Sequence, residues 1–137
     1  MPKHVPQGSK GFNPFADLIG LSFTKQESGW SKCQLNVEES LLNPYGMLHG
    51  GVIYSLADAA MGAAFYSTMD ESERCATVEM KIASFKPITS GILNCTVTVV
   101  HRSKRLGYLE AEVKSQEGIV DRASSTFSIY ETRGNSQ

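Results

Sequence analysis

The sequence of 137 residues predicts a single α+β domain, in which an antiparallel sheet of five to six strands curls around one long, buried helix. Two observations support this fold class. Residues 50–69 form an apolar segment of helical composition with one charged residue, and residues 75–129 hold four runs in which apolar and polar side chains alternate. Only short turns separate these runs, which is typical of an antiparallel meander.

Five to six strands are expected: two before the helix and four alternating runs after it, of which the last is the weakest. The first two lie at residues 18–24 and 31–37, around a turn at Ser28-Gly29. In the third strand, Thr77 is predicted on the face opposite Met80. The apolar faces of the four later strands are Ala76, Val78, Met80 and Ile82; Leu93, Cys95, Val97 and Val99; Leu109, Ala111 and Val113; and, more weakly, Ala123, Ser125, Phe127 and Ile129.

The helical segment reads GGVIYSLADAAMGAAFYSTM, and Asp58 is its one charged residue. Its alanines and leucine favour a helix, which at ~1.5 Å per residue would extend over roughly 30 Å. A transmembrane helix is the competing interpretation. Against it stand the central aspartate, which would cost ~2.5–3.5 kcal/mol in a bilayer, and the lack of flanking Lys or Arg anchors. A helix that is apolar on nearly every face should be wrapped by protein.

Composition and charge exclude several classes of function. The formal net charge of −1 creates no field that would attract nucleic acid or a membrane surface. The chain has an odd number of cysteines, Cys33, Cys75 and Cys95, and none of them stands at C-x-x-C spacing. We therefore expect buried thiols rather than disulfides or a zinc site. No apolar run near the N-terminus could act as a signal peptide, which indicates the cytoplasm. We expect flexible ends at residues 1–14 and 132–137, around a domain at residues 15–131.

The loop before the helix, NPYGMLHGG at residues 43–51, contains the first candidate site. Gly50 and Gly51 would open the helix, whose first N–H groups are unpaired and carry a partial positive charge. Without side chains there, a ligand carbonyl could approach the backbone, and such a site can stabilise an oxyanion. Glycines that merely allow close packing are the alternative.

Asp58 is the candidate catalytic carboxylate. An ionised carboxylate within an apolar helix is unfavourable unless it has partners, and perturbed acids are common in active sites. A hydrogen-bonded structural aspartate is the alternative. The residues that other kinds of active site require are missing from the sequence. A metal site would need a second histidine at ligand spacing from His49, a serine nucleophile would need a G-x-S-x-G motif, and a catalytic cysteine would need a paired histidine. We therefore expect no metal and no cofactor.

Together these residues form a recognisable pattern. N-P-x-G-x-x-H-G-G at residues 43–51, followed by L-A-D-x-A at 56–60 and T-V-E-M at 77–80, resembles the signature of hot-dog-fold acyl-CoA thioesterases of the PaaI-like type, in the 4-hydroxybenzoyl-CoA thioesterase superfamily. The resemblance covers roughly residues 15–130. It implies a hot-dog fold, in which the sheet wraps the long helix, and a homodimer or a dimer of dimers.

The resemblance also implies a role for each residue of the motif. Asn43 and the N–H of Gly50 would polarise a thioester carbonyl. Asp58 would activate the attacking water or attack directly, and Thr77 would help to hold that water. His49 would shape the loop. Because coenzyme A leaves as a thiolate, with a pKa near the ~8.5 of cysteine, no strong general acid is needed.

The phosphates of coenzyme A require cations, and HRSKR at residues 101–105 is the densest basic run of the chain. Lys104 and Arg105 are the candidates for phosphate binding, although a solvated turn is the alternative. Lys86 and Gly51 are further candidates for substrate binding. A small aromatic or a short to medium-chain acyl group is expected.

Two other functions are consistent with the fold class. A hot-dog hydratase or dehydratase would need an Asp-x-Asn-Pro-x-His loop, and the chain has Asn43 in the turn instead. A non-catalytic acyl-CoA-binding regulator would carry a DNA-binding segment, for which the residues before the motif leave no room.

The spacing of Gly50 and Asp58 predicts where an active site could be assembled. At ~1.5 Å per residue the two positions are separated by about 12 Å along the helix. An oxyanion donor and a base must both lie within about 3 Å of the reacting group or its water. One straight helix cannot supply both, but two antiparallel helices around a two-fold axis can. We therefore expect a dimer with two composite sites.

Overall fold

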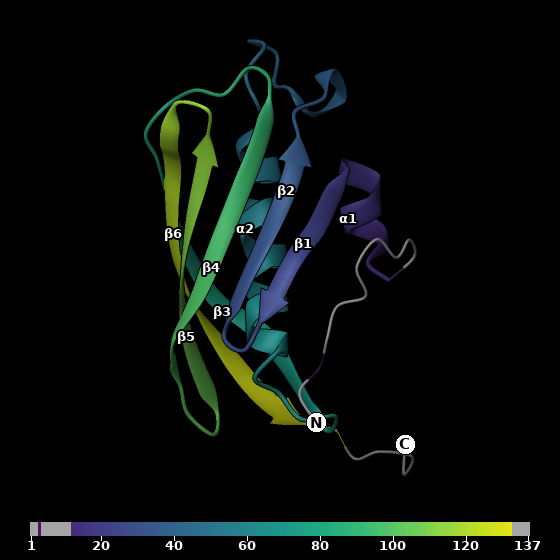
Figure 1. Ribbon diagram of the computed structural model, residues 1–137, viewed down its shortest axis with the longest axis vertical. Helices are drawn as coiled ribbons and strands as arrows, with labels where there is room; N and C mark the ends of the chain where they lie inside the picture. The colour runs from purple at the N-terminus through teal and green to yellow at the C-terminus, as the bar shows by residue number, and fades with distance from the viewer. Residues whose placement is uncertain (1–2, 4–11, 133–137) are drawn as a thin grey trace.

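The computed structural model describes Lys3 and residues 12–132, which form one antiparallel sheet with a long helix against one of its faces (Figure 1). The strand order is β1-β2-β4-β5-β6-β3, so that β1 and β3 are the edges of the sheet. This arrangement confirms the predicted hot-dog fold. The elements are α1 (Pro14–Ile19), β1 (Leu21–Glu27), β2 (Trp30–Asn36), a short 3₁₀ helix (Glu39–Leu41), α2 (Gly50–Tyr66), β3 (Glu73–Ser84), β4 (Ile92–Arg102), β5 (Leu106–Ser115) and β6 (Gly118–Glu131).

Helix α2 begins at Gly50, as the sequence predicts, but ends at Tyr66 rather than at residue 69. The hydroxyl groups that follow explain the early end. Ser67 Oγ donates to the carbonyl of Ala64 at 2.6 Å, and Thr68 Oγ1 donates to that of Phe65 at 2.7 Å. These side chains satisfy carbonyls that further helical N–H groups would otherwise bind.

The predicted strand at residues 18–24 is displaced, because the short helix α1 occupies its first residues and β1 begins at Leu21. Asn13 caps this helix by accepting the N–H of Ala16 at 3.1 Å, and Pro14 stands at its first position. Gly20, with φ +77°, ends it in the left-handed conformation. Of the expected flexible ends, residues 1–2, 4–11 and 133–137 lie outside the described residues.

Strand β3 departs from the simple alternation that the sequence predicts. Its register against β6 shifts between Thr77 and Glu79, so a bulge interrupts the period. Val78 is 59% exposed, whereas Met80 is half-buried, and the predicted grouping of Ala76 and Val78 with Met80 is therefore wrong. The bulge instead turns the side chain of Thr77 towards α2. Thr77 therefore lies on the same face of β3 as Met80, and not on the opposite face as the sequence predicts.

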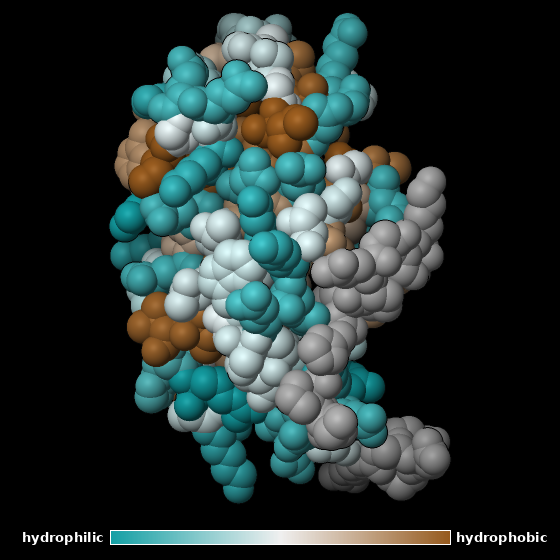
Figure 2. Space-filling model, in the orientation of Figure 1, coloured by the Kyte–Doolittle hydropathy of each residue, from teal (hydrophilic) through white to brown (hydrophobic). Residues whose placement is uncertain are grey.

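The other three strands alternate as predicted, and their apolar faces meet α2 in one core. The outer face, seen in Figures 1 and 2, is mostly hydrophilic with small, separate apolar patches. Cys33 and Cys95 are buried free thiols, as expected, whereas the free thiol of Cys75 is half-buried. Burial raises the pKa of Cys95 to about 12, and Asp121 contributes to this shift.

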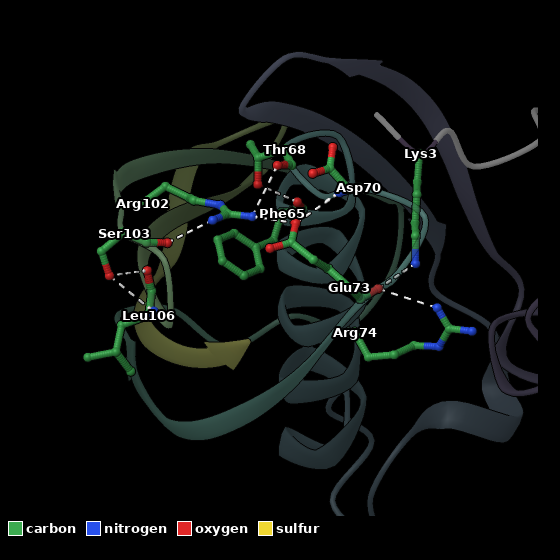
Figure 3. Close-up of polar contacts among 9 residues, drawn as sticks. All are labelled: Lys3, Phe65, Thr68, Asp70, Glu73, Arg74, Arg102, Ser103 and Leu106. Carbon is green, nitrogen blue, oxygen red and sulfur yellow. Dashed lines mark hydrogen bonds and ion pairs between the residues drawn. The ribbon is translucent and has the colours of Figure 1, made fainter. Parts of the chain in front are cut away.

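Arg102 joins the β4–β5 hairpin to the end of α2 and the start of β3 (Figure 3). Its guanidinium group lies over the ring of Phe65 at 5.9 Å and forms an ion pair with Glu73 at 2.7 Å. It also donates to the carbonyl groups of Thr68 and Ser103. Phe65 in turn packs edge-on against Phe127 of β6, so this cluster also joins α2 to β6.

Candidate active site

The loop before α2 is held by the side chain of Asn43. Asn43 Oδ1 accepts the N–H groups of Tyr45 at 2.9 Å and Met47 at 3.1 Å, while the Asn43 N–H donates to the Met47 carbonyl at 2.6 Å. Gly46, with φ +79°, allows the turn between them. Oδ1 is occupied by the loop itself, and the side-chain amide Nδ2 has no acceptor among the described residues. Asn43 thus offers a donor beside the start of the helix.

His49 is the N-cap of α2, and its Nδ1 accepts the N–H of Gly51 at 2.8 Å. A neutral His49 must therefore carry its proton on Nε2. A Cβ at Gly51 would lie 3.0 Å from His49 Nδ1, which explains the glycine at this position. Because His49 occupies the Gly51 N–H, the N–H of Gly50 is the donor at the helix start that remains free among the described residues.

Asn43 and Gly50 line one side of a groove of about 310 Å³. The other side is residues 84–88, at the end of β3 and beyond, and includes Lys86. The two sides are joined by a hydrogen bond from the Leu48 N–H to the Ile88 carbonyl at 2.7 Å. Three residues that the sequence predicts as site residues thus line a single groove. Asn43 and Gly50 offer free N–H donors, and Lys86 offers a cation.

Asp58 and Thr77 form a second pair, which does not line that groove. Thr77 Oγ1 donates to Asp58 Oδ1 at 2.7 Å, and Asp58 is half-buried on α2. The bulge in β3 makes this contact possible. The thiol of Cys75 lies nearby, and its pKa is raised to about 11, mainly by burial and in part by the charge of Asp58. Cys75 therefore stays protonated at neutral pH.

Lys104 and Arg105 lie at the opposite end of the fold from the groove. They sit in the β4–β5 turn, at the bottom of Figure 1, whereas α2 begins near the top. They line a hollow of about 360 Å³ together with Glu73, Tyr130 and Glu131. Within one chain, the expected phosphate-binding residues are thus remote from Asn43 and Gly50.

One polar pair that adjoins the groove is absent from the sequence prediction. Ser84 lines the groove, and its Oγ donates to the carboxylate of Asp121, which is 1% exposed. Asp121, Ala123 and Ser125 are spaced two residues apart along β6, so their side chains lie on the same face of the strand. The alternation that predicts Ala123 and Ser125 to point inward therefore predicts the same for Asp121.

No helix within the described ranges is long and apolar enough to cross a membrane. No three His, Cys, Asp or Glu side chains among residues 12–132 and Lys3 come together in a way that could hold a metal ion.

The family model of the thioesterase superfamily matches residues 45–121, which include Gly50, Asp58, Thr77 and the three candidate cations. The chain belongs to the thioesterase superfamily. A relative from Saccharolobus solfataricus that bears the name of an esterase is 32% identical over 88% of this chain and 81% of its own length. The proofreading thioesterase EntH of Klebsiella pneumoniae is 23% identical over 77% of each chain.

Solved structures agree with this assignment. A conserved protein of Pseudomonas aeruginosa superposes with a TM-score of 0.83 at 29% identity, over 86% of this chain and 94% of its own. A mutant of the phenylacetic acid degradation protein PaaI of Thermus thermophilus has the same fold, with a TM-score of 0.79 at 23% identity, over 85% and 98% of the two chains. Membership in the superfamily supports thioester hydrolysis as the general activity of this chain.

Proposed function

We propose that this thioesterase hydrolyses the thioester of an acyl-CoA with a small aromatic or a short to medium-chain acyl group. The observation that carries the proposal is the pair of free N–H donors, Asn43 Nδ2 and Gly50 N, beside a groove that also presents Lys86. Support for coenzyme A comes from a relative in Listeria monocytogenes, named 1,4-dihydroxy-2-naphthoyl-CoA hydrolase, which is 25% identical over 73% of this chain and 81% of its own.

In the proposed reaction, the two donors bind the carbonyl oxygen of the thioester and stabilise the negative charge that develops there. Asp58 either removes a proton from the attacking water or attacks the carbonyl carbon itself. The hydrogen bond from Thr77 fixes the orientation of the carboxylate. The products are the free acid and the thiol of coenzyme A, and the reaction as written consumes only water.

The active site is proposed to form between two copies of the chain. Asn43 and Gly50 line a groove that Asp58 and Thr77 do not reach, and about 12 Å of helix separates Gly50 from Asp58. A second copy related by a two-fold axis would bring its own Asp58 and Thr77 to this groove. Strand β3 is an edge of the sheet with a free side, which is the part of a sheet most able to pair with another chain.

The same arrangement accounts for the remote position of Lys104 and Arg105. In an antiparallel pair of β3 strands, the Glu73 end of one copy lies beside the Ser84 end of the other. The basic turn of one copy would then lie near the groove, and near Lys86, of its mate. We propose that all three cations bind the phosphates of coenzyme A.

The test is the hydrolysis of a panel of aromatic, short and medium-chain acyl-CoAs by the wild type and by Asp58→Asn. The variant keeps the shape of the side chain and its hydrogen bond from Thr77, so it should fold. Its kcat should fall by roughly 10²–10⁴, as for the loss of a general base. Glu110→Gln, which removes an exposed carboxylate on the outer face of β5, is the matched control and should keep wild-type activity. A near-normal kcat for Asp58→Asn would refute the assignment.

A further inference from the structure

Asp121 is the only charged side chain that is fully buried in the part of the chain that the structure describes. One carboxylate oxygen, Oδ2, accepts the hydroxyl of Ser84, and the other, Oδ1, is buried without a hydrogen-bond partner. A buried carboxylate with one hydrogen bond is unfavourable, since buried charges are normally paired. The fold thus tolerates a costly group at this position.

The surroundings of Asp121 do not compensate for its charge. Asp121 lies opposite Ser84 of β3 and Val113 of β5, and the described residues provide no cation to pair with it. Burial raises the pKa of the carboxyl group, and the hydrogen bond from Ser84 acts in the opposite direction. The hydrogen bond from Ser84 is therefore the contact that favours the charged carboxylate of Asp121. Ser84 is also the contact that reaches the surface of the protein.

Ser84 connects the buried carboxylate to the groove. It is an exposed residue and lines the groove together with Asn43 and Gly50. Its hydroxyl hydrogen is directed at Asp121, so its oxygen has only lone pairs left for a ligand. A hydroxyl that donates to a carboxylate is also a stronger acceptor, because hydrogen bonds in a chain polarise one another. The Ser84 oxygen is thus an acceptor for an N–H or O–H group of a ligand.

The place of Ser84 in the groove indicates which group that is. This step rests on the proposed function, in which the thioester carbonyl lies at Asn43 and Gly50. In the same proposal a phosphate binds Lys86, which is two residues beyond Ser84. The pantetheine arm connects these two parts of the substrate, and its amides supply N–H donors. We propose that Ser84 accepts a hydrogen bond from an amide N–H of the pantetheine arm, and that Asp121 is the positioning residue that holds the Ser84 hydroxyl in this orientation.

The proposal makes Ser84 a determinant of specificity for pantetheine thioesters over thioesters of simple thiols. It can be tested by binding alone, which separates it from the proposed hydrolysis. Calorimetry would measure the affinity of desulfo-CoA, which has the arm and the phosphates, and of adenosine 3′,5′-bisphosphate, which lacks the arm. Ser84→Ala should weaken desulfo-CoA about three- to tenfold, as for one neutral hydrogen bond, and leave the bisphosphate unchanged.

Three further variants distinguish recognition from a structural role. Ser84→Thr keeps the hydroxyl and should bind desulfo-CoA like the wild type. Asp121→Asn keeps an acceptor for that hydroxyl but removes the charge that polarises it, so its affinity for desulfo-CoA should lie between those of the wild type and Ser84→Ala. Ser90→Ala, at an exposed serine that lines a different groove, is the matched control. Equal affinity of wild type and Ser84→Ala for desulfo-CoA, an equal loss with the bisphosphate, or no binding of desulfo-CoA by the wild type would each overturn the inference. If Ser84 affects binding as expected while no acyl-CoA is hydrolysed, the proposed function alone fails.

Discussion

The composite active site predicts that two inactive variants restore each other. Asn43→Ala removes a donor of the groove, and Asp58→Asn removes the carboxylate, so each variant alone should be nearly inactive. In a mixed dimer, one site would combine both substitutions, and the other would combine the intact Asn43 of one copy with the intact Asp58 of the other. The mixture should therefore regain activity without any wild-type chain.

The magnitude follows from the two-fold geometry. With random pairing of equal amounts, half of the dimers are mixed, and one of the two sites in each mixed dimer is intact, which gives about a quarter of wild-type activity. The assay follows thiol release from an acyl-CoA after the two variants are dissociated, mixed and reassociated. Differently tagged copies, purified through both tags, would verify the exchange. A mixture of verified mixed dimers that stays as inactive as its parents would show that each site is built within one chain.

Three other predictions concern binding and stability. Replacing both Lys104 and Arg105 with alanine should raise KM much more than it lowers kcat, and the effect should shrink for a pantetheine thioester that lacks the nucleotide phosphates. Asp121→Asn should raise the free energy of unfolding at pH 7 by about 1–3 kcal/mol, because it removes a buried charge, and this gain should fade as the pH falls towards 3.8, the ordinary pKa of the group. Gly107→Ala should lower the stability by about 1–3 kcal/mol in urea unfolding, since its Cβ would overlap the buried ring of Phe65.

A specific result would contradict each of these three predictions. An equal rise in KM with both thioesters would exclude phosphate recognition by the β4–β5 turn. The sign for Asp121 follows from a raised pKa, which favours the protonated acid in the folded protein, so a gain that grew towards low pH would contradict it. Gly62→Ala, whose Cβ would meet nothing within 4 Å, should not be destabilising, and a loss equal to that of Gly107→Ala would argue against the steric explanation.

Much of this architecture can be predicted from the sequence because it depends on local patterns. The start of α2 follows from Gly50-Gly51 and the alanine-rich segment, and β4, β5 and β6 follow from the alternation of apolar and polar residues. Helix α1 had its own local signals, Asn13-Pro14 before it and Gly20 after it, although its six residues do not produce a strong period.

What the sequence alone determined is the set of elements and the list of reactive side chains, because periodicity, capping residues and motif spacing act over short stretches of chain. Tertiary structure decided which of these side chains meet. A bulge against β6 turns Thr77 towards Asp58, and the register of β3 on β6 places Ser84 beside the buried Asp121. Both contacts depend on strand register over long separations in the chain, and no local pattern reports the register at which two strands pair.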